Sequence, residues 1–252
     1  MGTSSRIFEA QLSRIKDQLE GYHDFVFLQG EVETDPAPGI KEFYPGPYYT
    51  YFEVPTKCQV QAALELLEEF IEDEGPFDGV IAFSNGAAVA ASYLLQDSKR
   101  PSPQHPFKCA VFFCASLPFD LDSIPFTTSV DGTYHLVGSA KPISSRQIFS
   151  SMPELKSNGI CTEKWDRKAP LLWRYGTFQD CITASIGIPS THIFATNDIT
   201  YREQSMLSQK LFQAQNREVV EHREGHDIPR DRSSTAKIQR SIQNMLRATL
   251  VG

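Results

Sequence analysis

The sequence predicts an α/β fold in which a mostly parallel sheet is flanked by helices. Helical and strand-like patterns alternate through much of the 252-residue chain, and such alternation is typical of parallel sheets with helical connections. The composition, 40% hydrophobic and 22% charged, is that of an ordinary globular chain that can build a full core. We therefore expect one α/β domain spanning residues 1–252.

The first part of the chain predicts a helix, a strand and a long loop. Apolar residues recur at helical spacing from Phe8 to Leu19, and Gly21 is placed to end that helix. Residues 24–28 predict a short buried strand. Residues 29–56 contain too many prolines for a regular helix or a central strand. Their many aromatic residues favour a folded flap over a free linker.

The middle of the chain predicts the centre of the sheet. An amphipathic helix covers residues 60–71 and ends before Gly75-Pro76. A short apolar strand follows at residues 80–83, then a helix of small residues at 87–95 and a second central strand at 109–114. A strand, a helix and another strand in this order form the parallel βαβ unit.

The regular alternation is interrupted at residues 115–187 and returns after them. This segment is rich in Ser, Pro, Phe and Gly and contains both tryptophans, so we interpret it as a cap-like insertion packed over an edge of the sheet. Afterwards the pattern predicts strands at 191–195 and 218–222, with a helix at 204–212 between them. The last helix is marked by apolar residues from Ile238 to Thr249.

A candidate nucleophile lies between the strand at 80–83 and the small-residue helix. Residues 82–86 read Ala-Phe-Ser-Asn-Gly, and a serine in this setting predicts the nucleophile elbow of the α/β-hydrolase fold. Gly86 supplies the small neighbour that this strained turn requires, whereas Ala82 stands where glycine is usual. The helix directs its N-terminal amides at Ser84, so we expect the N–H of Asn85 to bind a developing oxyanion.

An acid and a histidine follow Ser84 in the order that this fold uses. Asp198 comes shortly after the predicted strand ending at Ala195, and His226 lies in the loop after the next strand. Carboxyl ends of parallel strands meet at one edge of a sheet. We therefore expect Ser84 to attack a carbonyl, His226 to take and return the proton, and Asp198 to orient His226.

Each of these residues also has a simpler interpretation. Ser84 followed by Asn-Gly is compatible with a plain turn, Asp198 with a helix cap, and His226 with a surface loop. The catalytic interpretation rests on their order and on their shared position at strand ends. His192 and His222 are weaker candidates, because both lie inside predicted strands.

Composition and charge exclude several other classes. The net charge is −7 with no basic run, which argues against nucleic acid as a partner. The sequence contains no apolar stretch of membrane-spanning length and no signal-peptide core at its start, so we expect a soluble cytoplasmic protein. The five cysteines form no CxxC pair, which favours reduced, mostly buried thiols over a metal site or a disulfide framework. We expect no cofactor.

At four blocks of sequence the chain resembles the fungal family of small serine hydrolases that includes the lovastatin polyketide thioesterase. The blocks are residues 75–80 (GPFDGV), 83–88 (FSNGAA), 189–193 (PSTHI) leading to Asp198, and 222–229 (HREGHDIP). The resemblance implies an α/β-hydrolase that cleaves esters or thioesters without a cofactor. Many of the relatives lie beside polyketide synthases, where they release or trim the acyl product. For this chain the resemblance implies a small-molecule acyl ester or thioester as the substrate, either free or bound to a carrier protein.

The chain departs from the family pattern at its beginning. Members of the family start with a short strand inside the sheet, followed by a segment like Met1-Gly2-Thr3-Ser4, and the loop after the strand supplies a second oxyanion donor. The sequence lacks that strand, through either an upstream translation start or loss of the element. We therefore expect an α/β-hydrolase without the usual first strand, in which the amide of Gly2 is the candidate second donor.

Three functions are compatible with these residues. The first is hydrolysis of an ester or thioester of a largely apolar acyl substrate through an acyl-enzyme at Ser84. The second is a degenerate hydrolase that serves as a non-catalytic binding protein, which the missing strand and Ala82 favour. The third keeps the same three residues but transfers the acyl group to an alcohol or amine.

Overall fold

The central sheet of the protein has four parallel strands in the order β11-β10-β4-β3. They are β3 (Gly79–Phe83), β4 (Cys109–Phe113), β10 (Ser190–Ala195) and β11 (Arg217–His222). The computed structural model describes residues 1–19, 23–129, 133–138, 141–144, 170–175 and 185–251. The parallel sheet and its flanking helices confirm the predicted fold class.

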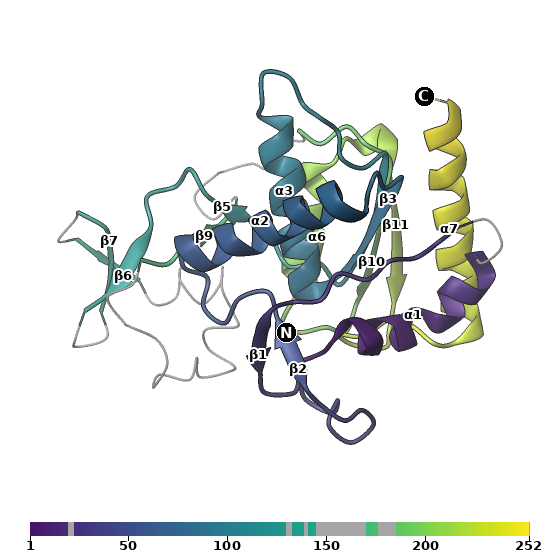
Figure 1. Ribbon diagram of the computed structural model, residues 1–252, viewed down its shortest axis with the longest axis horizontal. Coiled ribbons are helices and arrows are strands. Elements are labelled where there is room, and N and C mark those ends of the chain that lie inside the picture. Colours follow the sequence, from purple (N-terminus) through teal and green to yellow (C-terminus); the bar gives the residue numbers. More distant parts are fainter. Residues whose placement is uncertain (20–22, 130–132, 139–140, 145–169, 176–184, 252) are drawn as a thin grey trace.

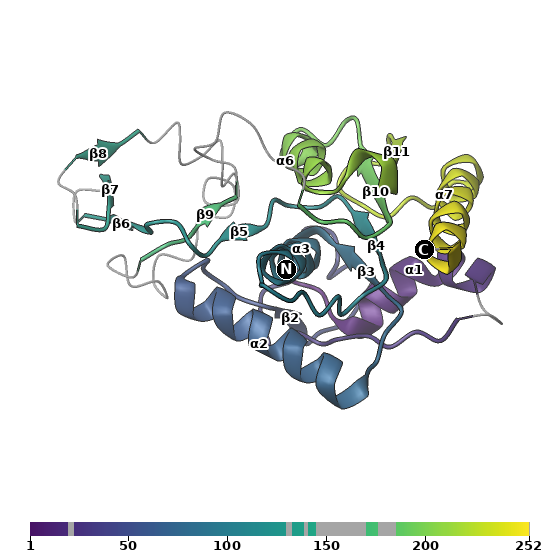
Figure 2. The same cartoon turned by 90° about the horizontal axis from the view of Figure 1, so that it is seen from above.

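Helices cover both faces of the sheet, as Figure 2 shows. α2 (Lys57–Glu74), α3 (Ser84–Ser98) and α6 (Arg202–Ser208) lie on one face, and α1 (Ser5–Leu19) and α7 (Arg232–Val251) lie on the other. The strand β4 is buried throughout. Its Ala110 and Phe112 join the core with α2 and α3, whereas Val111 and Phe113 join the core with α1 and α7. This alternation is what a strand covered on both faces requires.

Local sequence sets the ends of the helices on the first face. The Thr56 side chain accepts a hydrogen bond from the N–H of Gln59 and caps α2, which ends at Gly75. α3 begins at Ser84 itself, directly after β3. Its alanines are almost fully buried, so this helix packs closely between α2 and the sheet. The predicted helices at 8–19, 60–71 and 87–95 are therefore confirmed.

The strand predicted at residues 24–28 is wrong. These residues form no strand, and Val26 is 54% exposed. Within the described residues β3 pairs only with β4, and a cavity of about 1950 Å³ lies between the free edge of β3 and Phe25–Leu28. An extended segment needs a neighbouring strand for its backbone hydrogen bonds. No strand of the described chain pairs with the other edge of β3.

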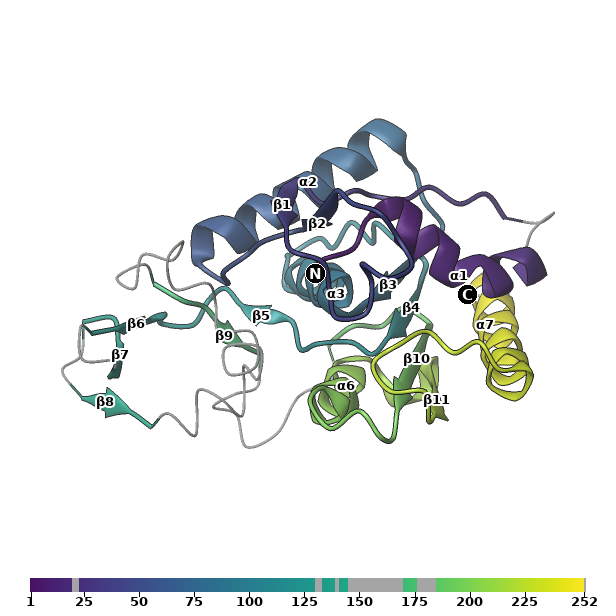
Figure 3. The same cartoon turned by 90° about the horizontal axis from the view of Figure 1, so that it is seen from below.

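The proline-rich segment folds as a flap with a short antiparallel pair. β1 (Val32–Thr34) pairs with β2 (Tyr48–Thr50) outside the central sheet. The N-terminus lies against this pair, because Thr3 forms a bridge with Tyr49 (Figures 1 and 3). The sequence predicted a folded flap here but not these two strands.

Small strands occupy the described parts of residues 115–187. β5 (Phe119–Asp120) pairs with β9 (Trp173–Arg174), and β6 (Phe126–Thr128), β7 (Tyr134–Leu136) and β8 (Pro142–Ile143) form a three-stranded sheet. Figure 3 shows them beside the helices α2 and α6, away from the central strands. Phe126, Leu171 and Trp173 form a separate apolar cluster with Val54. Trp165 lies outside the described residues.

The C-terminal part follows the predicted order. Two 3₁₀ turns, Gln209–Leu211 and Ala214–Asn216, connect α6 to β11. Ile238, Ile242 and Met245 of α7 are buried against the sheet. In the part of the chain that the structure describes, no helix combines the length and the apolar character needed to cross a membrane.

Candidate active site

Ser84 lies at the junction of β3 and α3, where the backbone is strained. Its φ is +51°, in the left-handed region that residues with a side chain rarely adopt. Small residues follow the serine: Ala87 is fully buried, and a Cβ atom at Gly86 would lie in ordinary contact, 3.4 Å from the Tyr51 ring. The predicted junction is therefore a sharp strand-to-helix turn that presents the Ser84 side chain at the end of β3.

His226 lies in the loop after β11 and reaches Ser84. Its Nε2 atom is 2.8 Å from Oγ of Ser84. The preceding residue, Gly225, has a φ of +69° and open space around it, so glycine provides the left-handed turn that brings the imidazole back over the sheet. The sequence places these two residues 142 positions apart, and parallel strands bring them to one edge.

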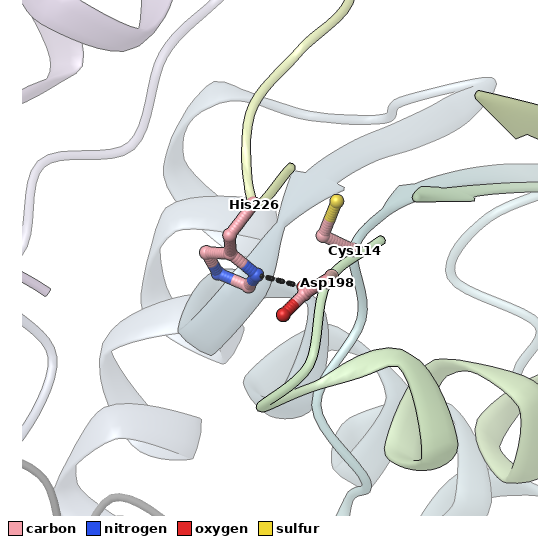
Figure 4. Close-up of side chains that lie close together, drawn as sticks. All are labelled: Cys114, Asp198 and His226. Carbon is pink, nitrogen blue, oxygen red and sulfur yellow. Dashed lines mark hydrogen bonds and ion pairs between the residues drawn. The ribbon is translucent and has the colours of Figure 1, made fainter. Parts of the chain in front are cut away.

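Asp198 contacts the other nitrogen of the same imidazole. Its Oδ2 atom is 2.7 Å from Nδ1 of His226, as the dashed line in Figure 4 marks. Its Oδ1 atom accepts hydrogen bonds from the N–H groups of Thr200 at 3.2 Å and Tyr201 at 3.0 Å. Burial raises the pKa of Asp198, but the hydrogen bonds from His226, Tyr201 and Thr200 outweigh it and hold that pKa below its usual value. The carboxylate is therefore ionised at neutral pH.

Asn197 ties the Asp198 turn to the His226 loop, a role that the sequence did not reveal. Its Oδ1 accepts from the N–H of Gly225 at 3.1 Å, and its Nδ2 donates to the carbonyl of Arg223 at 3.0 Å. The only signal in the sequence for this role is that Asn197 precedes the candidate acid. Its distance along the chain to the His226 loop follows no regular pattern. The contact holds the two loops at a fixed separation.

Cys114 lies beside the Asp198–His226 pair (Figure 4). Its Sγ atom is 3.7 Å from the carbonyl oxygen of Asp227 and 4.0 Å from that of Gly225. Burial, followed by the nearby Asp198 charge, raises the pKa of the thiol to about 12. Among the described residues, Cys114, Asp198 and His226 form the one group with potential metal ligands within 4.8 Å of each other. A protonated thiol is a poor ligand, so the geometry favours a hydrogen-bonded acid and base with a neutral thiol beside them.

The other two histidines of the sheet are structural. His192 is buried in β10 against the rings of Phe112 and Phe212, and burial lowers its pKa to about 3. His222 is buried at the end of β11, where its Nδ1 accepts from the N–H of Glu224. Burial also lowers the pKa of His222. Neither ring contacts Ser84.

The candidate oxyanion donors differ in what their amides contact. Asn85 is the second residue of α3, where a backbone N–H has no partner within the helix. The N–H of Gly2 donates to the carbonyl of Tyr49 at 3.1 Å. We expected the Gly2 amide to be a second oxyanion donor. In the structure this N–H points at the carbonyl of Tyr49 instead of at Ser84.

The three candidate residues open into the large cavity beside β3. Ser84, Asp198 and His226 line it together with aromatic residues of the flap, among them Tyr49, Tyr51 and Phe52. Burial raises the pKa of Tyr51 to about 12, so its ring is a neutral part of the wall. Phe43 is 77% exposed, so part of the aromatic cluster faces solvent instead.

Curated relatives over the whole chain are named as hydrolases. Esterase alnB of Emericella nidulans is 27% identical, covering 96% of this chain and 94% of its own. Esterase FPY3 of Fusarium mangiferae is 26% identical, covering 100% of this chain and 96% of its own. Hydrolase phiM of Talaromyces stipitatus is 27% identical over 97% of this chain and 84% of its own.

Solved structures with the same fold include a lipase and a carboxylesterase. A monoacylglycerol lipase from Paleococcus ferrophilus superposes with a TM-score of 0.52 at 12% identity, covering 99% of this chain and 91% of that one. A carboxylesterase from Mesorhizobium loti superposes with a TM-score of 0.51 at 13% identity, covering 96% of this chain and 84% of that one. These likenesses establish the α/β-hydrolase fold. The family model described as serine hydrolase (FSH1) matches residues 1–238, and the chain therefore belongs to that family of serine hydrolases.

Proposed function

We propose that this serine hydrolase cleaves an ester or thioester through an acyl-enzyme at Ser84. His226 removes the proton from Oγ as the oxygen attacks the carbonyl, and returns it to the leaving group. Water then hydrolyses the acyl-enzyme with His226 as the base. Asp198 holds the imidazole in the tautomer that has its proton on Nδ1 and stabilises the imidazolium.

One observation carries this proposal. The imidazole of His226 bridges Oγ of Ser84 at 2.8 Å and Oδ2 of Asp198 at 2.7 Å. Both distances are within the range that a nucleophile, a base and an orienting acid require. The position of Ser84 at a strained turn before a helix N-terminus adds the favourable field for a developing negative charge.

The oxyanion site requires N–H groups that point at the developing negative charge. We propose the N–H of Asn85 for this role, because it is in the first turn of α3 beside Ser84. A site with a single donor stabilises the transition state less, because loss of one donor lowers kcat by about 10² to 10³ in comparable enzymes. The amide of Gly2 can serve as the second donor only after it releases the carbonyl of Tyr49.

We propose a medium-to-large, largely apolar acyl group as the substrate. The support is the apolar and aromatic part of the cavity wall, which includes Tyr51, Phe52 and Val89. Pockets for small-molecule ligands are lined by apolar and aromatic side chains, with polar groups that fix the orientation of the ligand. A polyketide acyl chain, free or bound to a carrier protein as a thioester, fits this description. Residues 115–187 are the proposed cap, and the reaction as written uses no cofactor.

Pre-steady-state and steady-state kinetics with matched ester and thioester series test this function. Acyl groups from acetyl to lauroyl are offered as p-nitrophenyl esters and as N-acetylcysteamine thioesters. The proposal expects a burst of leaving group, a mass increase equal to the acyl group, and kcat/KM that rises with chain length. Adding alcohol or amine acceptors and analysing the products separates hydrolysis from acyl transfer. A folded protein that turns over no member of either series contradicts the proposal.

A further inference from the structure

Two aromatic rings lie against the imidazole of His226. The ring of Tyr201 is the nearer one, with its centroid 4.5 Å from that of His226 and an angle of 39° between the planes. The centroid of Phe83 is 5.3 Å away at the same angle. Tyr201 also lines the cavity beside the candidate site. These distances are within the range of favourable aromatic contacts.

The backbone fixes Tyr201 where it is. Its N–H donates to Oδ1 of Asp198 at 3.0 Å, and its carbonyl accepts from the N–H of Ser205 at 3.0 Å in the first turn of α6. Neither bond involves the Tyr201 side chain. A change of side chain therefore removes the ring while the turn that holds Asp198 keeps its hydrogen bonds.

The ring has two physical effects on the imidazole. As a packed neighbour it limits rotation of His226 away from the line that joins Oγ of Ser84 to Oδ2 of Asp198. As a π-system it attracts a cation at its face, and His226 becomes a cation while it holds the proton of Ser84. The second effect is stronger in the transition state than in the resting enzyme, which is the condition for an effect on kcat.

We infer that Tyr201 is a positioning residue, whose ring orients His226 and stabilises its charged form, while its backbone fixes Asp198. This inference rests on the proposed function of the three residues. One turn, residues 198–201, thus supplies the acid and the aromatic contact for the same imidazole. No sequence signal points to Tyr201, because the ring–ring contact joins loops after two different strands.

Four variants separate the ring from other properties of the position. Tyr201→Phe keeps the ring and removes the hydroxyl, whereas Tyr201→Leu and Tyr201→Met remove the aromatic face but stay apolar. Ile199→Ala is the control on the same turn, because Ile199 is 99% exposed. Urea unfolding shows whether each variant is folded. If either Tyr201→Leu or Tyr201→Met does not fold, the other one tests the loss of the ring.

The expected result is a loss of kcat in the non-aromatic variants alone. Tyr201→Leu and Tyr201→Met lower kcat by about tenfold and change KM by less than about twofold, whereas Tyr201→Phe and Ile199→Ala stay near wild type. The low-field proton resonance of the His226 Nδ1–H group broadens or shifts in the same two variants. A change in KM with acyl chain length, and unchanged kcat, would overturn the inference by assigning Tyr201 to substrate contact.

Labelling by a fluorophosphonate distinguishes failure of this inference from failure of the proposed function. If wild type reacts at Ser84 and Tyr201→Leu reacts about tenfold more slowly, the inference is supported. Equal rates in the two proteins would overturn it and leave the proposed function standing. Equal losses in Tyr201→Phe and Tyr201→Leu would also overturn it, because they would assign the effect to the hydroxyl. A wild type that does not react overturns both.

Discussion

Asp198 uses its two carboxylate oxygens for different purposes, and only one of them contacts His226. Oδ2 lies 2.7 Å from Nδ1 of His226, whereas Oδ1 accepts from the N–H groups of Thr200 and Tyr201. Both interpretations that the sequence allows for this residue, a turn-forming cap and a catalytic acid, are therefore compatible with the structure. Substitutions that affect one oxygen or both should separate the two roles.

Asp198→Asn should retain the turn and lose activity. The amide oxygen can still accept from Thr200 and Tyr201, but an NH₂ group facing Nδ1 favours the wrong imidazole tautomer. We expect kcat to fall by about 10³ to 10⁴, with a midpoint of thermal unfolding below wild type only by the contribution of the ionised carboxylate. Asp198→Ala, which loses both oxygens, should have similarly low kcat and a lower unfolding midpoint. Equal midpoints for Asn and Ala would contradict the division of roles.

Asp198 should also make the stability of the protein depend on pH in the acid range. Its pKa is lowered in the folded protein, so the ionised form adds stability above the unfolded value of about 3.9, and this stability is lost as the pH falls through the folded value. Urea unfolding of wild type and Asp198→Asn, from about pH 7 to about pH 3, measures it. The stability advantage of wild type should shrink toward acid pH; an advantage that is constant or grows would be inconsistent with a lowered pKa.

Two glycines in the left-handed region should respond differently to alanine. Gly2 and Gly39 both have positive φ, but a Cβ at Gly2 would lie 2.3 Å from the backbone nitrogen of Ala37, whereas Gly39 has open space. Both substitutions carry the left-handed penalty of about 1–2 kcal/mol. Only Gly2→Ala must also move backbone, so its free energy of unfolding should be clearly the lower of the two. Comparable losses, measured by urea unfolding, would argue against the close packing of residues 2 and 37.

The described cysteines should differ in reactivity. Cys58 is exposed, whereas Cys109 and Cys114 are buried, and burial raises the pKa of both buried thiols. Iodoacetamide at neutral pH should alkylate Cys58 in the native protein and the other two only in urea. Peptide mass spectrometry assigns each adduct. Rapid native alkylation of Cys114 would contradict its packing beside Asp198.

Much of the fold could be predicted because periodicity and chain order carry it. The apolar run at β4, the small residues of α3 and the apolar stripe of α7 each have one physical explanation, burial against a sheet, and each was found where the sequence predicted it. The prediction of a strand at residues 24–28 was wrong, because an apolar run alone is not enough to form a strand. An apolar run indicates a strand only when a neighbour is present to pair with it, and periodicity does not report neighbours.

The candidate site divides in the same way. Ser84, Asp198 and His226 could be predicted because each follows a strand in a known order, and the structure brings them together. Asn197, Cys114 and Tyr201 could not, because their contacts join loops with no fixed spacing in sequence. The cysteines illustrate the limit for single residues. Cys109 and Cys114 are buried as expected, but Cys58 on α2 is exposed, and Cys161 and Cys181 lie outside the described residues.

The most direct test of the account is whether Ser84 is an activated nucleophile. Intact-mass analysis after treatment with a fluorophosphonate, on wild type and on Ser84→Ala, measures this. We predict one adduct on wild type, none on the variant, and a loss of esterase activity in the variant of about 10³-fold or more. A folded wild type that forms no adduct, or a Ser84→Ala variant that is labelled to the same extent, would contradict the central role assigned to Ser84.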